Sequence, residues 1–217
     1  MVYGILRLIN FAHSDIFMVG AYFAFFLLAI FRLPWGVSAI LAIVLTALVG
    51  IIVDRAAYRP VRNAPRISAL MTAVGVSFFL ENLGLVTVGA RPKAFQRPDI
   101  MARVIKIGPA AVSGVSIWVP ILSLALLALL LFIVYRTKVG MAMRSVSTDI
   151  ETTRLMGVDV DRVISYTFAI GSALAAAGGI MWACKYPQIN PLMGIYPGWK
   201  AFTAAVVGGI GNITGAM

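Results

Sequence analysis

Long stretches without a charged residue divide the chain into alternating apolar and polar segments. Four of these stretches are long enough to span a membrane, because a spanning helix needs about 20 apolar residues and tolerates about 17–25. Two shorter apolar runs, 16–31 and 201–217, lie toward the ends of the chain. The pattern therefore predicts a bundle of membrane-spanning α-helices. The four long runs are residues 33–53, residues 67–90 (interrupted only by Glu81), residues 107–135 (most apolar from Val115) and residues 163–184.

The composition excludes the main soluble classes of protein. Hydrophobic residues make up 61% of the 217 residues, and charged residues make up only 12%. A soluble domain has about 45–50% apolar and about 25% charged residues, since it must cover its core with polar groups. The single cysteine, Cys184, cannot form an internal disulfide and is interpreted as a packing residue. A soluble enzyme domain, a disordered tail and a disulfide scaffold are therefore excluded, and the fold class is an all-α, polytopic transmembrane helical bundle.

Both ends of the chain have the character of interrupted helices. Residues 1–6 are apolar and lack the charged first segment of a signal peptide. Residues 208–217 carry neither a stop signal nor a basic anchor. We therefore expect residues 1–217 to form a single transmembrane domain that is truncated at both ends. A complete small protein with a re-entrant end is the alternative.

The net charge of +10 indicates basic loops beside anionic lipid headgroups rather than nucleic acid. It does not set the orientation of the chain in the membrane. With alternating spans, nine Lys and Arg residues fall on one side, in 54–66 and 136–162. Eight fall on the other side, in 32–34, 91–106 and 185–200.

The polar segment 136–162 predicts a short docking helix. Thr148 and Glu151 have the S/T-x-x-E spacing of a capping box, in which the threonine accepts the N3 amide and the glutamate reaches back. Gly157 is placed to end this helix at C′, which gives a helix over about 149–156. An ordinary interfacial turn fits the pattern equally well. The residues available for contact are Ile150, Leu155 and Met156, and the predicted cap of the following span is Asp161.

The same segment resembles the coupling loop of ABC importer permeases. The residues Glu151-Thr-Thr-x-x-x-Gly157 are similar to the E-A-A-x-x-x-G loop of that family, with threonine in place of both alanines. In the family, this loop forms the coupling helix that sits in a cleft of the ATPase subunit. The resemblance implies that 136–162 is a cytoplasmic coupling loop. The residues it assigns to coupling with the ATPase are Thr148, Glu151, Arg154 and Gly157.

Three separated motifs narrow this resemblance to the permeases of branched-chain amino-acid ABC importers, of the LivH type more than the LivM type. Residues 2–22 read VYGILRLINFAHSDIFMVGAY, with Ser14 where the family has glycine. Residues 140–160 contain GMAMRS and RLMGVDV, and residues 204–217 read AAVVGGIGNITGAM. The resemblance covers essentially the whole chain.

This resemblance implies a permease subunit that imports branched-chain or related amino acids by alternating access. The implied partners are two ABC ATPase subunits, a second LivM-like permease or a second copy of this chain, and a periplasmic substrate-binding protein. The implied location is the inner membrane of a bacterium, within the lipid bilayer. The sequence contains no G-x-x-x-x-G-K-[ST] motif, nucleophile elbow or metal-ligand cluster, so we expect no catalytic activity, metal or cofactor in this chain.

Polar residues at membrane depth are candidates for lining a translocation pathway, because charge there costs roughly 2.5–3.5 kcal/mol on insertion scales. The alternative is structural, with His13 capping a helix or pairing with Asp15, and Glu81 pairing with an arginine. An ion-coupled secondary transporter that uses Glu81 or Asp15 is the competing function. A membrane assembly protein without transport activity is a third class. The pathway candidates are Asn10, His13 and Asp15, together with Glu81 and Asn82.

Small residues recur at a spacing of four near the end of the chain. Small side chains at this spacing let helix backbones approach closely, so we interpret them as helix-packing residues rather than as pore lining. These residues are Gly171, Ala175 and Gly179, and further on Gly211 and Gly215.

Overall fold

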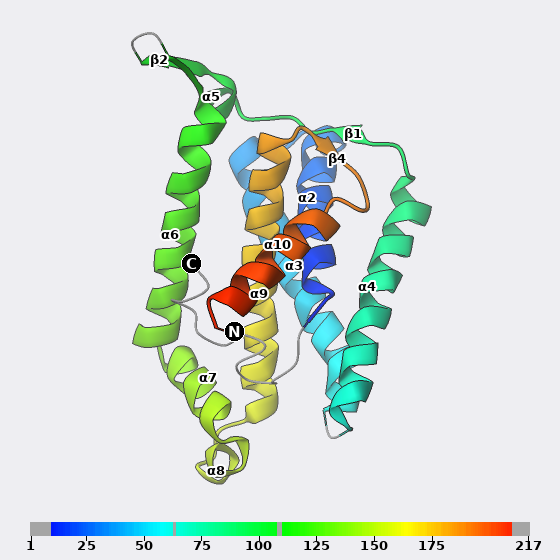
Figure 1. Ribbon diagram of the computed structural model, residues 1–217, viewed down its shortest axis with the longest axis vertical. Coiled ribbons are helices and arrows are strands. Elements are labelled where there is room, and N and C mark those ends of the chain that lie inside the picture. The colour runs from blue at the N-terminus through cyan, green and yellow to red at the C-terminus, as the bar shows by residue number, and fades with distance from the viewer. Residues whose placement is uncertain (1–9, 63, 108–109, 210–217) are drawn as a thin grey trace.

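The computed structural model describes residues 10–62, 64–107 and 110–209, which form a bundle of long helices (Figure 1). Three helices make up the centre of the bundle, and two more flank it on opposite sides in Figure 1. The central helices are α2 (His13–Ala29), α3 (Trp35–Val53) and α9 (Val160–Lys185); the flanking helices are α4 (Arg66–Val88) and α6 (Gly114–Arg136).

Within the described residues, four helices are long and apolar enough to cross a membrane. They coincide with the four long apolar runs of the sequence, so the predicted all-α, polytopic transmembrane bundle is confirmed. The shorter run 16–31 corresponds largely to α2, with 17 residues. Of the run 201–217, residues 201–207 lie in α10 (Ile195–Val207), and residues 210–217 lie outside the described residues. In Figure 1, α10 crosses obliquely in front of the central helices. The four spans are Trp35–Val61, Ile67–Val88, Gly114–Arg136 and Val160–Lys185.

The first of these spans continues past α3 in a different helical geometry. Asp54–Tyr58 is a π-helical segment, η1, and Arg59–Val61 is a turn of 3₁₀-helix, η2. π-helical turns are rare and occur frequently at functional sites. The residues of η1 and η2 therefore carry side chains around the end of α3 in directions that a continuous α-helix would not give them.

One end of the molecule, which we call the hairpin end, holds all of the β-structure in the described residues. The strands β2 (Val104–Ile107) and β3 (Ala110–Ser113) pair antiparallel, with Val104 opposite Ser113. The strands β1 (Lys93–Ala94) and β4 (Gln188–Ile189) join the loop before α6 to the loop after α9. The short helix α5 (Asp99–Ala102) lies between β1 and β2. The sequence pattern shows only a basic loop here, because strands this short leave no readable alternation.

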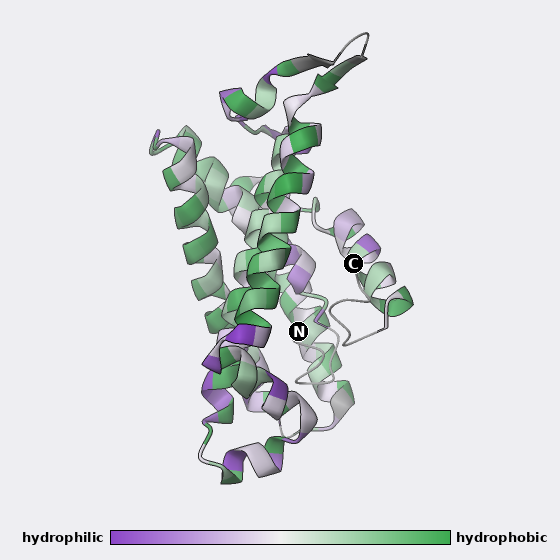
Figure 2. Ribbon diagram, turned by 90° about the vertical axis from the view of Figure 1, so that its left-hand side faces the viewer, coloured by the Kyte–Doolittle hydropathy of each residue, from purple (hydrophilic) through white to green (hydrophobic). Residues whose placement is uncertain are grey.

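The opposite end, which we call the α8 end, contains two further helices, α7 (Lys138–Thr148) and α8 (Ile150–Leu155). Figure 2 shows hydrophilic residues gathered toward this end, while the long helices are largely hydrophobic. The sequence predicted one short helix here and missed α7, an amphipathic helix of 11 residues. Its buried residues Met143 and Val146 join an apolar cluster with Tyr58 and Phe168, so tertiary packing supports α7.

The backbone of α9 lies directly against α2 and α3. A Cβ atom added to Gly179 would lie 2.1 Å from the carbonyl oxygen of Phe17, and one added to Gly50 would lie 2.1 Å from the Oγ atom of Ser172. Only a hydrogen atom fits at either position, which is how small residues bring membrane helices together. Of the other small residues singled out in the sequence, Ala175 packs in a buried cluster with Ile16, Gly171 lies 3.8 Å by the same measure from the His13 ring, and Gly211 and Gly215 lie outside the described residues.

We expect Gly179→Ala to destabilise the protein by about 1–3 kcal/mol, because the new methyl group would meet backbone atoms of α2 and not a movable side chain. The measurement is the midpoint temperature of unfolding in detergent. Gly75→Ala in α4 is the control, since an added Cβ there has no atom within 4 Å and alanine is the better helix former. Equal midpoints for the two variants would contradict the close contact between α2 and α9.

Candidate functional site

The helix α8 is fixed at its start by Asp149. The carboxylate of Asp149 accepts hydrogen bonds from the backbone amides of Glu151, at 2.9 Å, and Thr152, at 3.2 Å. The hydroxyl of Thr152 donates to the same carboxylate. The hydroxyl and amide of Thr152, followed by the Glu151 amide, hold the pKa of Asp149 below its usual range. The cap therefore stays charged at neutral pH and is lost only in acid, as the pH falls through that lowered pKa.

This geometry corrects the predicted capping box. Thr148 is the last residue of α7, and its hydroxyl donates to the carbonyl oxygen of Arg144 at 3.1 Å. Asp149 has extended backbone angles, φ −151° and ψ 113°, so it ends α7 and begins α8 at the same residue. Glu151 contributes its backbone amide to this cap. The prediction was wrong by one position, because threonine and aspartate are both good N-cap residues. An N-cap residue has non-helical backbone angles, and of the two only Asp149 has them.

The helix α8 ends at a glycine in the left-handed conformation. Met156 is the C-cap, and Gly157 follows with φ +81°. The amide of Gly157 donates to the Arg154 carbonyl at 3.1 Å, and the amide of Val158 donates to the Thr153 carbonyl at 3.4 Å. A Cβ at Gly157 would have no atom within 4 Å, so the backbone angle and not the space requires glycine here.

The tip of α8 is apolar and exposed. Leu155 is 87% exposed and Met156 is 79% exposed, and Ile150 at the start of the helix is 39% exposed. Figure 1 places α8 at the extreme end of the molecule. Large apolar side chains gathered at an otherwise polar end are typical of an interaction surface. The helix α8 is therefore held in place at both of its ends, and it presents a small apolar surface at its tip.

The next helix, α9, begins three residues after Gly157 and is capped by Asp159. The carboxylate of Asp159 accepts from the Arg162 amide at 3.1 Å and pairs with the Arg162 side chain at 2.9 Å. The predicted cap, Asp161, was wrong, because it already lies in the first turn of α9. The sequence Val158-Asp-Val-Asp offers two acidic residues, and only the first precedes the helical residues.

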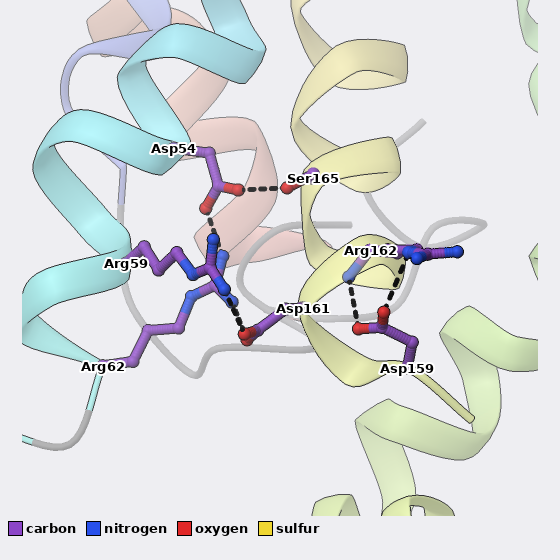
Figure 3. Close-up of polar contacts among 7 residues, drawn as sticks. All are labelled: Asp54, Arg59, Arg62, Asp159, Asp161, Arg162 and Ser165. Atoms are coloured by element: carbon purple, nitrogen blue, oxygen red, sulfur yellow. Dashed lines mark hydrogen bonds and ion pairs between the residues drawn. The ribbon is translucent and has the colours of Figure 1, made fainter. Parts of the chain in front are cut away.

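A partly buried ion cluster joins the start of α9 to the end of α3 (Figure 3). Asp54, the first residue of η1, is 0% exposed. Its carboxylate accepts from Nη2 of Arg62 at 2.5 Å and from Oγ of Ser165 at 2.6 Å. Nη1 of Arg62 donates to Asp161 at 2.5 Å, and Arg59 donates to the other oxygen of Asp161 at 3.1 Å. We call Asp54, Arg62, Asp161 and Ser165 the clasp.

The burial of Asp54 decides how much the clasp contributes to the stability of the protein. Removing one partner of a buried ion pair typically costs about 3–5 kcal/mol, because the other charge is left without compensation. The exposed pair of Asp159 and Arg162 belongs to a class that contributes about 0–1 kcal/mol. Sequence reasoning missed the clasp, since its members come together only when α3 and α9 pack. The one available signal was Asp54, a carboxylate that directly follows a long apolar run.

The structure brings two of the predicted pathway residues together and adds a third. Asp15 in α2 is buried, and its carboxylate accepts from Oγ of Ser77 in α4 at 2.5 Å. Glu81 lies one turn after Ser77 on α4, so it is on the same side of that helix, and it is half-buried. Among the described residues, Glu81 has no ion-pair partner. The sequence carries one signal for Ser77: it lies four residues before Glu81, and residues four apart share one side of a helix.

The other three pathway candidates lie elsewhere. Oδ1 of Asn10 accepts from the hydroxyl of Tyr58 at 2.6 Å, which ties the chain before α2 to η1. His13 is exposed. Asn82 is exposed as well, and its side-chain amide donates to the Phe78 carbonyl of its own helix at 2.7 Å.

The four spans indicate a multi-pass membrane protein, and the family that matches the sequence is one of transport permeases. The chain belongs to the family described as the permease component of the branched-chain amino acid transport system, which matches residues 1–217. The family indicated by the three sequence motifs is thereby confirmed.

Curated relatives cover the whole chain. It is 40% identical over 232 residues to the high-affinity branched-chain amino acid transport system permease protein LivH of Salmonella typhimurium. The matched region covers 100% of this chain and 74% of that protein. It is 38% identical over 230 residues to the corresponding permease protein BraD of Pseudomonas aeruginosa, with the same two shares. A probable LivH protein of Methanocaldococcus jannaschii is 29% identical over 218 residues, 96% of this chain and 67% of that protein. No solved structure matches the chain.

We expect Asp149→Ala to loosen α8 by about 1 kcal/mol, because the amides of Glu151 and Thr152 lose their acceptor. Amide hydrogen exchange of α8 should accelerate in this variant. Thr148→Ala is the matched control, and its exchange in α8 should equal that of the wild type. Faster exchange in the Thr148 variant than in the Asp149 variant would contradict the assignment of the cap.

Proposed function

We propose that the chain is the membrane-spanning permease of an ATP-driven ABC importer for branched-chain or related amino acids. The family supports a permease component, and the names of the relatives support this class of substrate. The observation that carries the coupling part of the proposal is α8, a helix held at both ends with an exposed apolar tip.

In this proposal, α8 docks into an ATPase subunit through Ile150, Leu155 and Met156. Fully burying a side chain of this size contributes about 1.5–3 kcal/mol, so the tip provides a useful share of a docking interface. Glu151 and Arg154 lie on the same short helix, where they are placed to pair with charges at the rim of the ATPase cleft. Closure of the ATPases on ATP then displaces α8.

The displacement reaches the membrane through α9. The connection from α8 to α9 is short, and hydrogen bonds hold it at Gly157 and Val158. The backbone of α9 in turn contacts α2 and α3. Moving α9 therefore moves the centre of the bundle, which is the rearrangement that alternating access needs.

Docking of α8 to an ATPase places residues 136–162 on the cytoplasmic side of the bacterial inner membrane. The hairpin end, with its basic loop 91–106, then faces the periplasm, where a substrate-binding protein delivers the amino acid. A basic loop on the periplasmic side is unusual, although the cytoplasmic loops still carry nine Lys and Arg residues against eight. Two ATPase subunits and a second permease, either LivM-like or another copy of this chain, complete the transporter.

A second candidate function is ion-coupled transport through Asp15 and Glu81. It is favoured by the burial of Asp15 against Ser77 and by the half-buried Glu81, since intramembrane carboxylates commonly face an ion or substrate pathway. In the importer, the same residues line the route of the substrate. Uptake into proteoliposomes separates the two functions: import that requires ATP and its ATPases supports the importer, and import driven by an ion gradient alone supports the second candidate.

We expect Gly157→Val to uncouple transport from ATP hydrolysis while leaving membrane insertion intact. A β-branched residue is strained at φ +81°, so the end of α8 must rearrange. The measurements are substrate uptake and ATP hydrolysis of the reconstituted transporter.

Gly89→Val is the matched control for this variant. Gly89 also has a positive φ, +86°, and a Cβ there would have no atom within 4 Å. It follows the last residue of α4, in a different part of the chain from α8. This variant also places a β-branched residue at a positive φ, but away from α8, and its uptake per ATP should equal that of the wild type. Normal uptake in Gly157→Val, or an equal loss of coupling in both variants, would contradict the role of α8.

A further inference from the structure

We propose that Arg62 is a positioning residue for coupling. Through the clasp, it passes a displacement of α8 and the first turn of α9 to the ends of α3 and α4. This inference rests on the proposed function, since it takes the ATPase to act on α8.

The first step runs from α8 to Asp161. Asp161 is the second residue of α9, four residues after Gly157. The amide of Val158 bonds to the last turn of α8 at 3.4 Å, and the amide of Val163 bonds to the Asp159 carbonyl at 3.1 Å. The connection between α8 and α9 is therefore short and held by hydrogen bonds, so a movement of α8 shifts Asp161.

The second step runs from Asp161 through Arg62 to Asp54. The guanidinium of Arg62 donates from one nitrogen to Asp161 and from the other to Asp54, at 2.5 Å in both cases. Its side chain is 12% exposed, and that of Asp54 is 0% exposed, so solvent and salt screen this bridge less than a surface pair. A planar guanidinium has donors fixed in a fork that can hold two carboxylates at once, which the compact ammonium of lysine does not reproduce.

Ser165 gives Asp54 a second connection to α9. It lies one turn after Asp161, and its hydroxyl donates to the oxygen of Asp54 that Arg62 leaves free. Farther along the same pair of helices, Gly50 lies against Ser172. The helices α3 and α9 are thus joined at two levels, and the clasp makes their ends at the α8 end move together.

The third step runs from Arg62 to α4. Arg62 lies four residues before Arg66, the first residue of α4, so the clasp and the start of this helix are close together along the chain. Farther along α4, Ser77 donates to Asp15 of α2. The helix that carries Ser77 and Glu81 therefore follows the clasp closely in the chain at its start and is bonded to α2 at Ser77. A displacement of the clasp changes how α4 lies against Asp15.

Asp161→Asn tests this inference with little risk to the fold. The buried pair of Asp54 and Arg62 stays intact, and Asp161 itself is 43% exposed. In the full-length permease reconstituted with its ATPases, we expect amino-acid uptake per ATP hydrolysed to fall about 2- to 30-fold. Asp161→Glu keeps a carboxylate and should restore much of the coupling. Arg162→Gln is the matched control: it breaks only the exposed pair in the same turn of α9, and its uptake per ATP should equal that of the wild type.

Each outcome bears on the inference separately from the proposed function. Wild-type uptake per ATP in Asp161→Asn, or the same loss in Arg162→Gln, overturns the role of the clasp. If Asp161→Asn does not insert, Arg62→Lys takes its place. It keeps a positive charge beside Asp54 and removes the bridge, and unchanged coupling in this variant also overturns the inference. Wild-type uptake that needs no ATP overturns the proposed function instead.

Discussion

The direct contact of α9 with the backbones of α2 and α3 is the interaction on which the rest of the structure depends. At Gly179, the carbonyl of Phe17 occupies the space of a side chain, and at Gly50 the side chain of Ser172 does the same. Helices packed this closely cannot shift by small independent amounts, because close-packed interiors transmit strain instead of absorbing it. Since α9 follows α8 after a short connection, the α8 end has a direct mechanical path into the centre of the bundle.

The flanking helices are joined to this centre in a different way. The outer faces of α4 and α6 expose large apolar residues such as Phe79 and Leu124, as surfaces turned toward lipid or another subunit do. Within the described residues, α4 is held by the hydrogen bond from Ser77 to Asp15 and by a few buried apolar side chains, among them Ala73 and Leu80. Little of α4 is buried, so this helix can change its position against α2 without the loss of a large apolar interface. Asp15 and Glu81, two of the candidates for a translocation pathway, therefore lie where α4 meets an otherwise tightly packed bundle.

The sequence predicts the features that depend on local pattern and misses those that depend on tertiary packing. The four spans follow from uncharged runs, and the end of α8 follows from Gly157, because few other residues accept its backbone angle. Thr148 and Asp161 were wrong as caps, since each has an acidic neighbour one or two residues away that serves better. The clasp could not be predicted, because Arg62 and Asp161 are separated by 99 positions and meet only when α3 packs against α9.

Photocrosslinking from α8 tests the central claim, that this helix docks to an ATPase, most directly. Benzoylphenylalanine is placed at position 156 and, as the control, at position 124 on α6. Both positions hold exposed apolar residues, since Met156 is 79% exposed and Leu124 is 64% exposed. The assembled transporter is irradiated in native membranes. If α8 docks to the ATPase, a crosslink to the ATPase subunit forms from position 156 and none forms from position 124. A crosslink from both positions, or from neither while the ATPase remains bound, would contradict this docking.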